Sequence, residues 1–198
     1  MTSKNKLSGS WIFQSDHVNE FAYWDEVFTK EECNTIIGYG ADLEEGLIKS
    51  NKNELQNAKI RDSEICWIFP TKENEWVFRR LVDVITNLNQ SYFGFELVGM
   101  LEGLQLTKYE APGGLYVKHI DKIYGGVIRK LSITVQLSDP ADYEGGDLCL
   151  HFSDTPEVMG KSLGKLVAFP SYALHEVTPV TKGTRYSLVA WVAGKPFK

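Results

Sequence analysis

Cysteine is scarce in this sequence, and its three cysteines are isolated from one another. Cys33, Cys66 and Cys149 form no Cys-x-x-Cys pair, so we expect neither a zinc site nor a disulfide framework. We interpret all three as small buried apolar residues in a reducing compartment, which predicts a cytoplasmic protein. A cysteine nucleophile is the alternative, although unreactive buried thiols are the commoner case.

Long apolar runs and basic runs are missing as well. No stretch approaches the roughly 20 apolar residues that a membrane helix needs. The first 14 residues lack the apolar core and the small-residue cleavage site of a signal peptide. The formal net charge is −5 and no Lys/Arg cluster stands out. We therefore expect no membrane partner and no nucleic-acid partner.

What the sequence does contain is ordinary for one globular domain. Hydrophobic residues make up 43% of the 198 positions and charged residues 24%, which suits a chain that can bury a substantial core. No internal repeat is evident. We predict a single domain over residues 1–198, with helical support over 26–92 and a strand-rich core over 96–193.

Two helices are predicted in the first half of the chain. In Phe28-Thr-Lys-Glu-Glu32, Thr29 is a plausible N-cap and Glu32 completes a capping box, and Gly38 or Gly40 would end this first helix. Its buried stripe would consist of Cys33, Ile36 and Ile37. A second, longer helix is indicated by apolar residues at three- and four-residue spacing, namely Trp76, Leu81, Val84, Ile85, Leu88 and Tyr92.

Three further N-terminal segments are less regular. Residues 1–25 are rich in aromatic side chains and are predicted to form an early strand or an arm, with His17 as an ordinary surface residue. The polar residues 41–57 are interpreted as a loop, either a substrate lid or disordered chain. Residues 58–69 are predicted as one strand that carries Arg61, Ser63 and Trp67 on the same face.

From about residue 96 the pattern changes to short strands separated by glycine turns. The predicted strands are 103–109, 115–119, 129–138, 147–152, 164–169, 174–178 and 185–192. None of the paired glycines opens a helix or precedes Gly-Lys-Ser/Thr, so they are not phosphate-binding loops. Seven or eight short strands after two helices predict an α+β, mainly β protein: a jelly-roll sandwich or barrel with the N-terminal helices packed outside.

One short stretch, Leu115-Tyr-Val-Lys-His119-Ile-Asp121, places an imidazole and a carboxylate two residues apart. At the end of a strand these two side chains project to the same face and could converge on one metal ion. His175 is the candidate for a third ligand. Two histidines and one carboxylate, with open positions opposite, describe the facial triad of non-haem Fe(II) oxygenases. His119, Asp121 and His175 are therefore the predicted metal ligands and catalytic centre.

Arg185 follows the distal histidine by ten residues, and a guanidinium grips a carboxylate through two parallel hydrogen bonds. It would hold the far end of a dicarboxylate co-substrate, and Ser187, on the same strand face, could donate to the same carboxylate. Gln136 and Thr134 share a face and could line this cavity, and Tyr109 could reach the co-substrate. Polar side chains on strands nevertheless usually face water.

Three other residues are given structural interpretations. A lone histidine on a strand is most often a hydrogen-bonded structural residue, which is how we interpret His151. Trp67 and Trp191 are predicted to belong to the core rather than to contact a ligand.

Longer runs of sequence now point to a family. The run from Leu104 to Asp121, including Leu104-Gln-Leu-Thr-Lys-Tyr109 and Pro112-Gly-Gly, resembles the 2-oxoglutarate- and Fe(II)-dependent oxygenases of the prolyl 4-hydroxylase type. So does His175-Glu-Val-Thr-Pro-Val-Thr-Lys-Gly-Thr-Arg185-Tyr-Ser-Leu-Val-Ala-Trp191. Similar segments include Arg129-Lys-Leu-Ser-Ile-Thr-Val-Gln-Leu-Ser, Tyr143-Glu-Gly-Gly-Asp-Leu, Arg61-Asp-Ser63 with Trp67, and the first helix. The resemblance covers roughly residues 25–193.

The resemblance implies a double-stranded β-helix (jelly roll) and a defined chemistry. His119, Asp121 and His175 would bind Fe(II), and 2-oxoglutarate would be the co-substrate, with its 5-carboxylate on Arg185 and assistance from Tyr109. O₂ would be consumed, and 2-oxoglutarate would be oxidatively decarboxylated to succinate and CO₂ as the substrate is hydroxylated. Ascorbate is a candidate reductant. Family members often carry Tyr where Gln136 stands, which leaves the 5-carboxylate contacts open.

The resemblance favours a hydroxylase of a peptidyl residue, with proline the family's usual target. A hydroxylase of a free amino acid or another small metabolite is the second hypothesis. A non-catalytic jelly-roll binding module with a vestigial metal site is the third. A zinc hydrolase would use the same three ligands but would leave Arg185 without its obvious partner.

Overall fold

Two antiparallel β-sheets form the framework of the protein. The computed structural model describes residues 18–40, 42–46, 60–121 and 126–196. His17, most of the predicted N-terminal arm and most of the predicted 41–57 loop lie outside these ranges. In the described part of that loop, Glu44–Glu45 form a short strand, β2, so this part of the loop prediction was wrong.

The larger sheet has the strand order β1-β12-β8-β14-β6-β4-β2, with β5 and β9 also paired to β14. Its strands are β1 (Ala22–Trp24), β2, β4 (Glu64–Ile68), β5 (Leu97–Gly99), β6 (Leu104–Glu110), β8 (Arg129–Gln136), β9 (Tyr143–Gly145), β12 (Leu166–Pro170) and β14 (Val180–Gly194). The smaller sheet has the order β11-β10-β13-β7-β3. Its strands are β3 (Arg61–Asp62), β7 (Leu115–His119), β10 (Leu148–His151), β11 (Glu157–Val158) and β13 (Leu174–Val177). The two sheets confirm the prediction of a mainly β protein.

The predicted strand over 58–69 is in fact two strands that belong to different sheets. β3 pairs with β7 in the smaller sheet, whereas β4 pairs with β6 and β2 in the larger one. The buried Ser63 lies between them. Glu64 is the register partner of Lys108, and its Oε2 lies 2.8 Å from the lysine Nζ. The chain therefore crosses from one sheet to the other here, which an alternation pattern alone does not indicate.

The first helix, α1 (Lys30–Gly38), begins as predicted. Thr29 is its N-cap, and the capping box is complete: the backbone N of Thr29 donates to Glu32 Oε2 (2.9 Å) and the backbone N of Glu32 donates to Thr29 Oγ1 (3.3 Å). Cys33 and Ile36 are fully buried, so the helix is fixed both by its cap and by its apolar side.

The second helix, α3 (Glu75–Leu88), buries Leu81, Val84, Ile85 and Leu88 as predicted, together with Val77. It continues into a π-helical turn, η1 (Asn89–Phe93). A π turn advances one residue further than an α turn, so Phe93 takes the buried position and Tyr92 is 43% exposed. The prediction that Tyr92 extends the buried stripe was therefore wrong.

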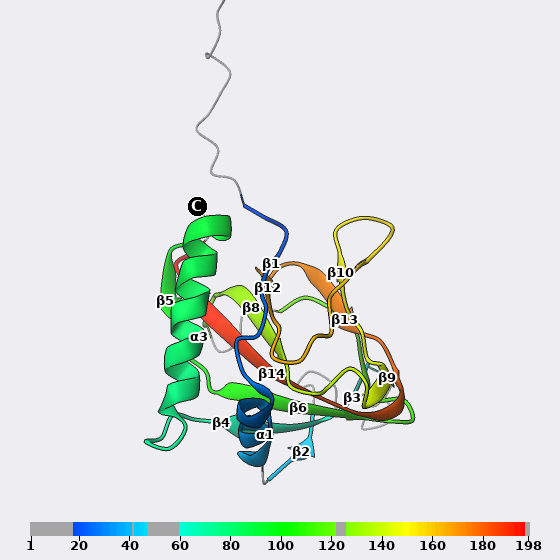
Figure 1. The fold of residues 1–198 in the computed structure, drawn as a ribbon. Coiled ribbons are helices and arrows are strands. Elements are labelled where there is room, and N and C mark those ends of the chain that lie inside the picture. The colour runs from blue at the N-terminus through cyan, green and yellow to red at the C-terminus, as the bar shows by residue number, and fades with distance from the viewer. Residues whose placement is uncertain (1–17, 41, 47–59, 122–125, 197–198) are drawn as a thin grey trace, which may run out of the picture.

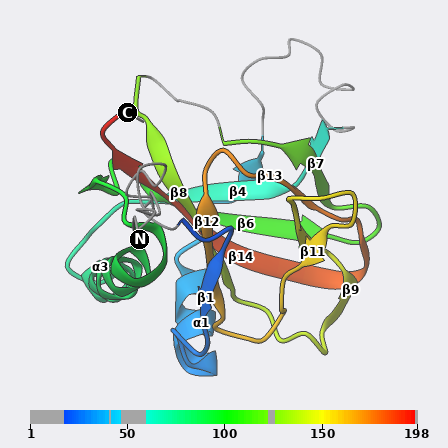
Figure 2. The ribbon, with the colours of Figure 1, turned by 90° about the horizontal axis from the view of Figure 1, so that it is seen from above.

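Hydrophobic residues of α1 and α3 form one core cluster with residues of the larger sheet, including Leu106, Ile133 and Leu188. Figures 1 and 2 show both helices on the side of the molecule away from β10 and β13. A second cluster joins the sheets, with Leu148 and Leu150 on β10 packing against Val167 and Phe169 on β12. Apolar packing thus holds the two sheets face to face.

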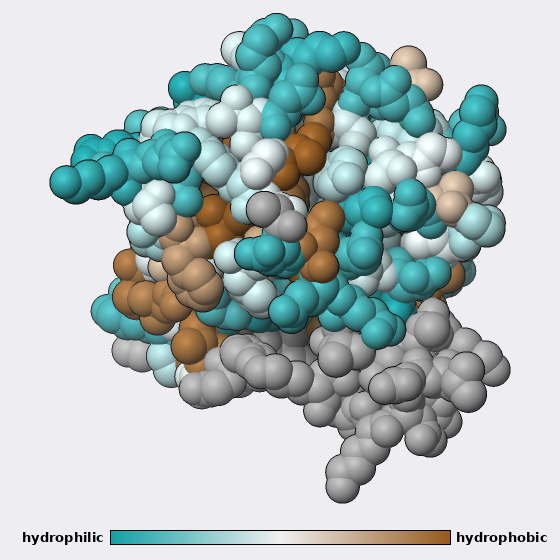
Figure 3. Space-filling model, turned by 90° about the horizontal axis from the view of Figure 1, so that it is seen from below, coloured by the Kyte–Doolittle hydropathy of each residue, from teal (hydrophilic) through white to brown (hydrophobic). Residues whose placement is uncertain are grey.

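Hydrophilic side chains cover much of the face in Figure 3, with hydrophobic residues gathered in patches between them. Individual exposed apolar side chains are ordinary on folded proteins. Within the part of the chain that the structure describes, no helix is long and apolar enough to cross a membrane.

Candidate metal and co-substrate site

Two of the predicted metal ligands face each other across neighbouring strands. His119 ends β7, and its register partner on β13 is His175. Asp121 lies two residues beyond β7, where its backbone N donates to the carbonyl of Ser171 (3.0 Å). Strand pairing therefore brings together residues that are far apart in the sequence.

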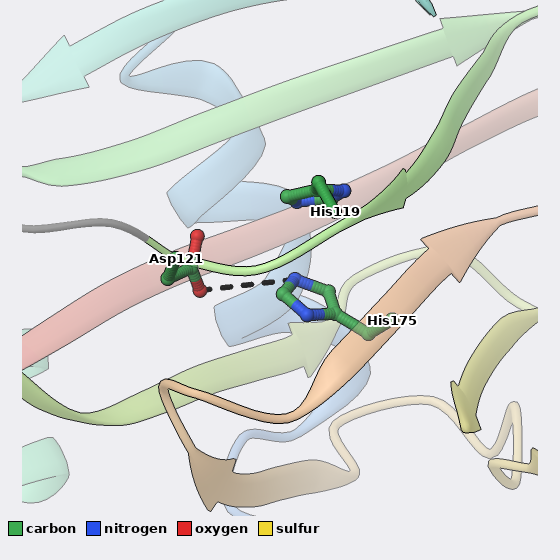
Figure 4. Close-up of side chains that lie close together, drawn as sticks. All are labelled: His119, Asp121 and His175. Atoms are coloured by element: carbon green, nitrogen blue, oxygen red, sulfur yellow. Dashed lines mark ion pairs between the residues drawn. The ribbon is translucent and has the colours of Figure 1, made fainter. Parts of the chain in front are cut away.

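The three side chains point toward one another, as Figure 4 shows. One ligand atom from each of His119, Asp121 and His175 can be chosen so that all three lie within 4.8 Å of one another. His175 Nε2 lies 3.7 Å from Asp121 Oδ2, and the two imidazole ring centres are 4.1 Å apart. Elsewhere among the described residues, no other three His, Cys, Asp or Glu side chains meet the same criterion.

Both histidines have a defined tautomer. His119 Nδ1 lies 2.8 Å from the carbonyl of Val117, and His175 Nδ1 lies 2.9 Å from the carbonyl of Ala173. A carbonyl only accepts, so each Nδ1 carries a proton, and Nε2 is the ring nitrogen of each histidine that is left for a metal. Burial, and then the neighbouring His175, lower the pKa of His119 to about 4. His119 is therefore a neutral imidazole at physiological pH, which is the form that binds a metal.

Aromatic rings hold the imidazoles in place. The Tyr116 ring stacks on His119 with ring centres 3.5 Å apart, and Phe169 lies against His175 with ring centres 4.7 Å apart. The Arg61 guanidinium covers Tyr116, 4.8 Å from the ring centre, and also donates to Ser63 and Gln105. This packing limits rotation of the imidazoles.

A second polar group lies in the same cavity. Arg185 on β14 is fully buried and is the register partner of Tyr109 on β6. Its Nη2 donates to Gln136 Oε1 (3.0 Å), and its Nη1 lies 3.5 Å from Ser187 Oγ. Its Nε is buried without a hydrogen-bond partner, and no ion pair joins Arg185 to a carboxylate of the described residues.

The glycine turn before Asp147 makes room for this arginine. Gly146 has φ +62, and a Cβ there would lie 3.0 Å from Arg185 Cδ and 2.9 Å from Val180 Cγ2. A side chain at Gly146 would therefore be strained by the backbone and crowded by its neighbours. The Gly145-Gly146 pair, which is not a phosphate loop, instead lets the guanidinium approach the cavity.

A cavity of about 160 Å³ contains both the His/Asp/His cluster and Arg185. Other residues on its wall include Arg61, Trp67, Tyr109, Tyr116, Arg129, Thr134, Ser187 and Trp191. A buried guanidinium and a set of metal-ligand atoms thus share one cavity, and this arrangement suits a small anion that also binds a metal.

Known proteins with similar sequences agree with this geometry. The family model described as the 2OG-Fe(II) oxygenase superfamily matches residues 104–193. A PKHD-type hydroxylase of Prochlorococcus marinus (strain NATL1A) is 33% identical over 153 residues, which cover 73% of this chain and 69% of that relative. The chain belongs to the 2OG-Fe(II) oxygenase superfamily. A PKHD-type hydroxylase of Picosynechococcus sp. (strain ATCC 27264 / PCC 7002 / PR-6) is 40% identical over 90 residues, which cover 45% of this chain and 41% of that relative.

Solved structures place this oxygenase in the prolyl 4-hydroxylase fold. A Pseudomonas putida prolyl-4-hydroxylase aligns with a TM-score of 0.67 at 20% identity, covering 89% of this chain and 94% of that one. A prolyl hydroxylase from Trichoplax adhaerens aligns with a TM-score of 0.71 at 19% identity, covering 89% and 84%. These alignments confirm the predicted jelly-roll fold, whereas the family model and the PKHD-type relative confirm the family resemblance and the dioxygenase class.

The residues of this oxygenase fit the groups that its superfamily name implies. Two imidazole nitrogens and one carboxylate form the donor set typical of non-haem Fe(II) sites. The unpaired buried Arg185 fits a dicarboxylate such as 2-oxoglutarate. His119, Asp121 and His175 are thus the side chains that could hold the iron, and Arg185 is the one that could hold the co-substrate.

The structure corrects the interpretation of several polar and aromatic side chains. Gln136, Ser187 and Thr134 are buried rather than facing water. Thr134 lines the cavity as predicted, whereas Gln136 is not part of its wall and contacts Arg185 instead. Trp67 is 38% exposed and lies on the cavity wall, so it is not a core residue. Trp191 is buried as predicted, but it also lines the cavity, and its indole Nε1 has no hydrogen-bond partner among the described residues. Where a strand borders a cavity, its side chains on that face have no apolar core to pack against. A sequence pattern does not show which strands border a cavity.

His151 has the structural role that was predicted, since its Nε2 lies 2.9 Å from Glu176 Oε1, and His151 is not part of the cavity wall. The sequence did not point to Ser132 or Arg129 individually. Strand alternation offered a signal for Ser132, because it lies on the same face of β8 as Thr134 and Gln136. Arg129 carried no such signal, because its partner Glu102 is distant in sequence: Arg129 Nε lies 2.8 Å from Glu102 Oε1.

Proposed function

We propose that this oxygenase hydroxylates a peptidyl residue, as a prolyl 4-hydroxylase does. In this proposal His119, Asp121 and His175 hold Fe(II), and Arg185 holds the 5-carboxylate of 2-oxoglutarate. The observation that carries the iron and co-substrate assignment is the buried Arg185 guanidinium, which lacks a described carboxylate partner and shares its cavity with the His/Asp/His cluster.

The energetic reason lies in the cost of burying a charge. A buried cation without an anion is destabilised by several kcal/mol, of the order measured when one partner of a buried ion pair is removed. A dicarboxylate supplies the missing anion and forms two charge-assisted hydrogen bonds with the guanidinium. Arg185 therefore selects a co-substrate with a carboxylate at its far end.

Three neighbours prepare this arginine for the carboxylate. Gln136 Oε1 accepts from Nη2 and fixes the guanidinium plane. The Ser187 hydroxyl, 3.5 Å from Nη1, can turn to donate to a bound carboxylate. The Tyr109 ring lies 5.3 Å from the guanidinium carbon and supports it through a cation–π contact. We assign Arg185, Tyr109, Ser187 and Gln136 to co-substrate binding.

When bound, Fe(II) and 2-oxoglutarate supply the oxidising power, consuming O₂ and releasing succinate and CO₂ as the substrate gains a hydroxyl group. The protein keeps the His119 imidazole neutral, orients the carboxylates and holds the reacting groups in a cavity that limits access of water. We add ascorbate as a proposed reductant, because an iron centre of this kind must be kept ferrous.

A peptidyl substrate is supported by the cavity mouth and by one structural neighbour. Arg61 and Trp67 lie on the cavity wall and come from β3 and β4, where the chain crosses between the sheets. The Trichoplax adhaerens prolyl hydroxylase was solved in complex with a peptide fragment of hypoxia inducible factor. We further propose a reducing, cytoplasmic location, which suits the three free cysteines.

The test is substrate-stimulated turnover of 2-oxoglutarate across matched panels of proline-containing peptides and free amino acids. We expect peptides to stimulate succinate formation and to gain 16 mass units, the mass of one oxygen atom. Stimulation by free amino acids alone would favour the small-metabolite hydroxylase and refute the peptidyl one.

A variant pair locates the substrate site. Trp67→Ala should reduce peptide-stimulated turnover while leaving the slower substrate-free turnover unchanged. Trp24→Ala removes a similarly exposed tryptophan from β1, away from the cavity, and should leave both rates unchanged. Equal behaviour of the two variants would refute the placement of the substrate beside Trp67.

A further inference from the structure

Asp121 is held differently from the two histidines. Each histidine is fixed by its Nδ1 hydrogen bond to a carbonyl two residues earlier on its own chain segment. Asp121 lies beyond the end of β7, and the terminal torsion of an aspartate is broad, so its carboxylate needs an outside contact to set its orientation.

That contact comes from two buried serines, one on β8 and one directly after β12. Ser132 on β8 donates its hydroxyl to Asp121 Oδ2. Ser132 Oγ also lies 2.9 Å from Ser171 Oγ, which follows β12. Ser132 and Ser171 are each only 1% exposed, so water does not readily replace these contacts.

The hydrogen-bond directions follow from the number of protons. A carboxylate only accepts, so the single hydroxyl proton of Ser132 is committed to Asp121. Ser132 must then accept from Ser171, and the chain runs Ser171 to Ser132 to Asp121. A hydrogen bond to a carboxylate is charge-assisted and stronger than one between neutral groups.

Ser171 also makes two backbone hydrogen bonds, one to Asp121 and one to Lys130. Its carbonyl accepts from the backbone N of Asp121 (3.0 Å), and its own backbone N donates to the carbonyl of Lys130 (3.0 Å). The same serine thus positions the Asp121 main chain directly and the Asp121 carboxylate through Ser132.

The other carboxylate oxygen of Asp121, Oδ1, faces Arg129, whose guanidinium also contacts other residues. Arg129 Nη1 lies 3.9 Å from Asp121 Oδ1, beyond hydrogen-bond distance. The Arg129 guanidinium binds Glu102 through two nitrogens and lies 3.8 Å from the centre of the Trp191 ring. Among the residues that the structure describes, Ser132 is the side chain with a hydrogen bond to the Asp121 carboxylate, so we take it as the group that orients this carboxylate.

We infer that Ser132 and Ser171 are positioning residues that hold the Asp121 carboxylate toward the two imidazoles, so that the metal site is formed before the metal arrives. This inference rests on the proposed function. Partners of metal-ligating groups typically contribute about 10- to 100-fold to metal affinity. Removing the Ser132 hydroxyl should lower affinity by that amount.

The experiment measures Mn(II) affinity of the full chain, in the absence of O₂ and co-substrate, by the loss of the free-ion EPR signal. Ser132→Ala should raise the Mn(II) Kd by about 10- to 100-fold. Ser132→Thr keeps the hydroxyl and should remain within several-fold of wild type. Ser171→Ala should have a smaller effect, since Ser132 would still donate to Asp121.

Ser138→Ala is the matched control. Ser138 lies two residues beyond the end of β8, is also buried, and accepts from the backbone N of Tyr186 (2.7 Å) rather than contacting the metal cluster. It should leave the Mn(II) Kd unchanged. A general loss of stability would affect both alanine variants, whereas a positioning role affects only Ser132→Ala.

The outcomes separate this inference from the proposed function. If wild type binds Mn(II) and Ser132→Ala binds it equally well, the serine pair has no positioning role. If Ser132→Ala does not fold, the other two variants decide. The positioning role would be refuted if Ser171→Ala left the Mn(II) Kd unchanged and Ser132→Thr bound Mn(II) as weakly as His119→Ala does. If wild type itself binds no Mn(II), the proposed metal site fails and the inference fails with it.

Discussion

His119 on β7 and His175 on β13 are register partners in the smaller sheet, and their ring centres lie 4.1 Å apart. Each also places its Nδ1 against the carbonyl of the residue two positions earlier. The strand pairing therefore sets the separation of two candidate metal ligands, and a local contact within each segment sets the tautomer of each. Asp121 depends instead on contacts made by β8 and the segment after β12.

Replacing one imidazole should abolish turnover without unfolding the protein. We expect His119→Ala to reduce succinate formation to background, since two ligands seldom hold a metal alone, while its far-UV circular dichroism stays that of wild type. His151→Ala is the matched control, because His151 is a strand histidine that contacts Glu176 outside the cavity. Turnover in His119→Ala comparable to that of His151→Ala would contradict the assigned metal site.

Replacing Arg185 should affect the thermal stability of the ligand-free and the liganded protein differently. Arg185→Met removes an unpaired buried charge, so the ligand-free variant should unfold at a temperature no lower than wild type. Wild type should be stabilised by about 2.7 kcal/mol when Mn(II) is present and 2-oxoglutarate is supplied at 100 times its Kd. The variant should lose this stabilisation at the same concentrations, as measured by thermal unfolding.

Arg79→Met serves as the control for this experiment, because Arg79 is an exposed arginine on α3 that pairs with Glu75. Its response to 2-oxoglutarate should equal that of wild type. A full thermal shift in Arg185→Met would show that the co-substrate does not use this guanidinium.

Cys33 should be chemically silent in the folded protein. Burial raises the pKa of its thiol to about 11, from an ordinary value of 9.0. At pH 8 the thiolate fraction is then roughly one in a thousand. We expect iodoacetamide at pH 8 to alkylate Cys33 only after denaturation, as read by peptide mass. Rapid native labelling would revive the cysteine-nucleophile alternative.

The same pKa shift gives the sign of an alkaline effect on stability. The folded state holds the Cys33 proton more tightly than the unfolded state, so its contribution is fully present below about pH 9. This contribution declines as the pH rises toward 11. Cys33→Ala should therefore lose less stability than wild type between pH 9 and 11 in urea titrations.

The capping box of α1 should affect stability alone. Thr29→Ala removes the hydroxyl that accepts from the backbone N of Glu32 and should cost about 0.5–2 kcal/mol. The 2-oxoglutarate KM should not change. Thr35→Ala is the control, since that exposed hydroxyl bonds to the carbonyl of Glu31 within the same helix and caps nothing. Equal losses in the two variants, measured by urea unfolding, would contradict the capping role.

The sequence predicted the parts of this protein that local patterns determine. The capping box of α1, the limits of β7 and the buried face of α3 all follow from residue spacing within one element. The grouping of His119, Asp121 and His175 was predicted because two imidazoles and one carboxylate form a known metal-binding donor set, and two of them lie two residues apart at the end of a strand. The buried state of Gln136 and Ser187 was harder to foresee, since alternation does not tell which face of a strand meets a cavity.

What the sequence could not give depends on distant contacts. The change of sheet at Ser63 arises because β3 and β4 find different partners, β7 and β6. The π turn that exposes Tyr92 and buries Phe93 shifts the helical period by one residue. The contact of Ser132 with Asp121 joins a strand to a segment beyond the end of another strand, and no local pattern contains it.

The most direct test is anaerobic calorimetry of 2-oxoglutarate binding to the Fe(II)-loaded protein. The proposed site predicts one 2-oxoglutarate per chain, with binding that requires the metal and is lost in both His119→Ala and Arg185→Met. Failure of Fe(II)-loaded wild type to bind 2-oxoglutarate, or equal binding by wild type and both variants, would contradict it.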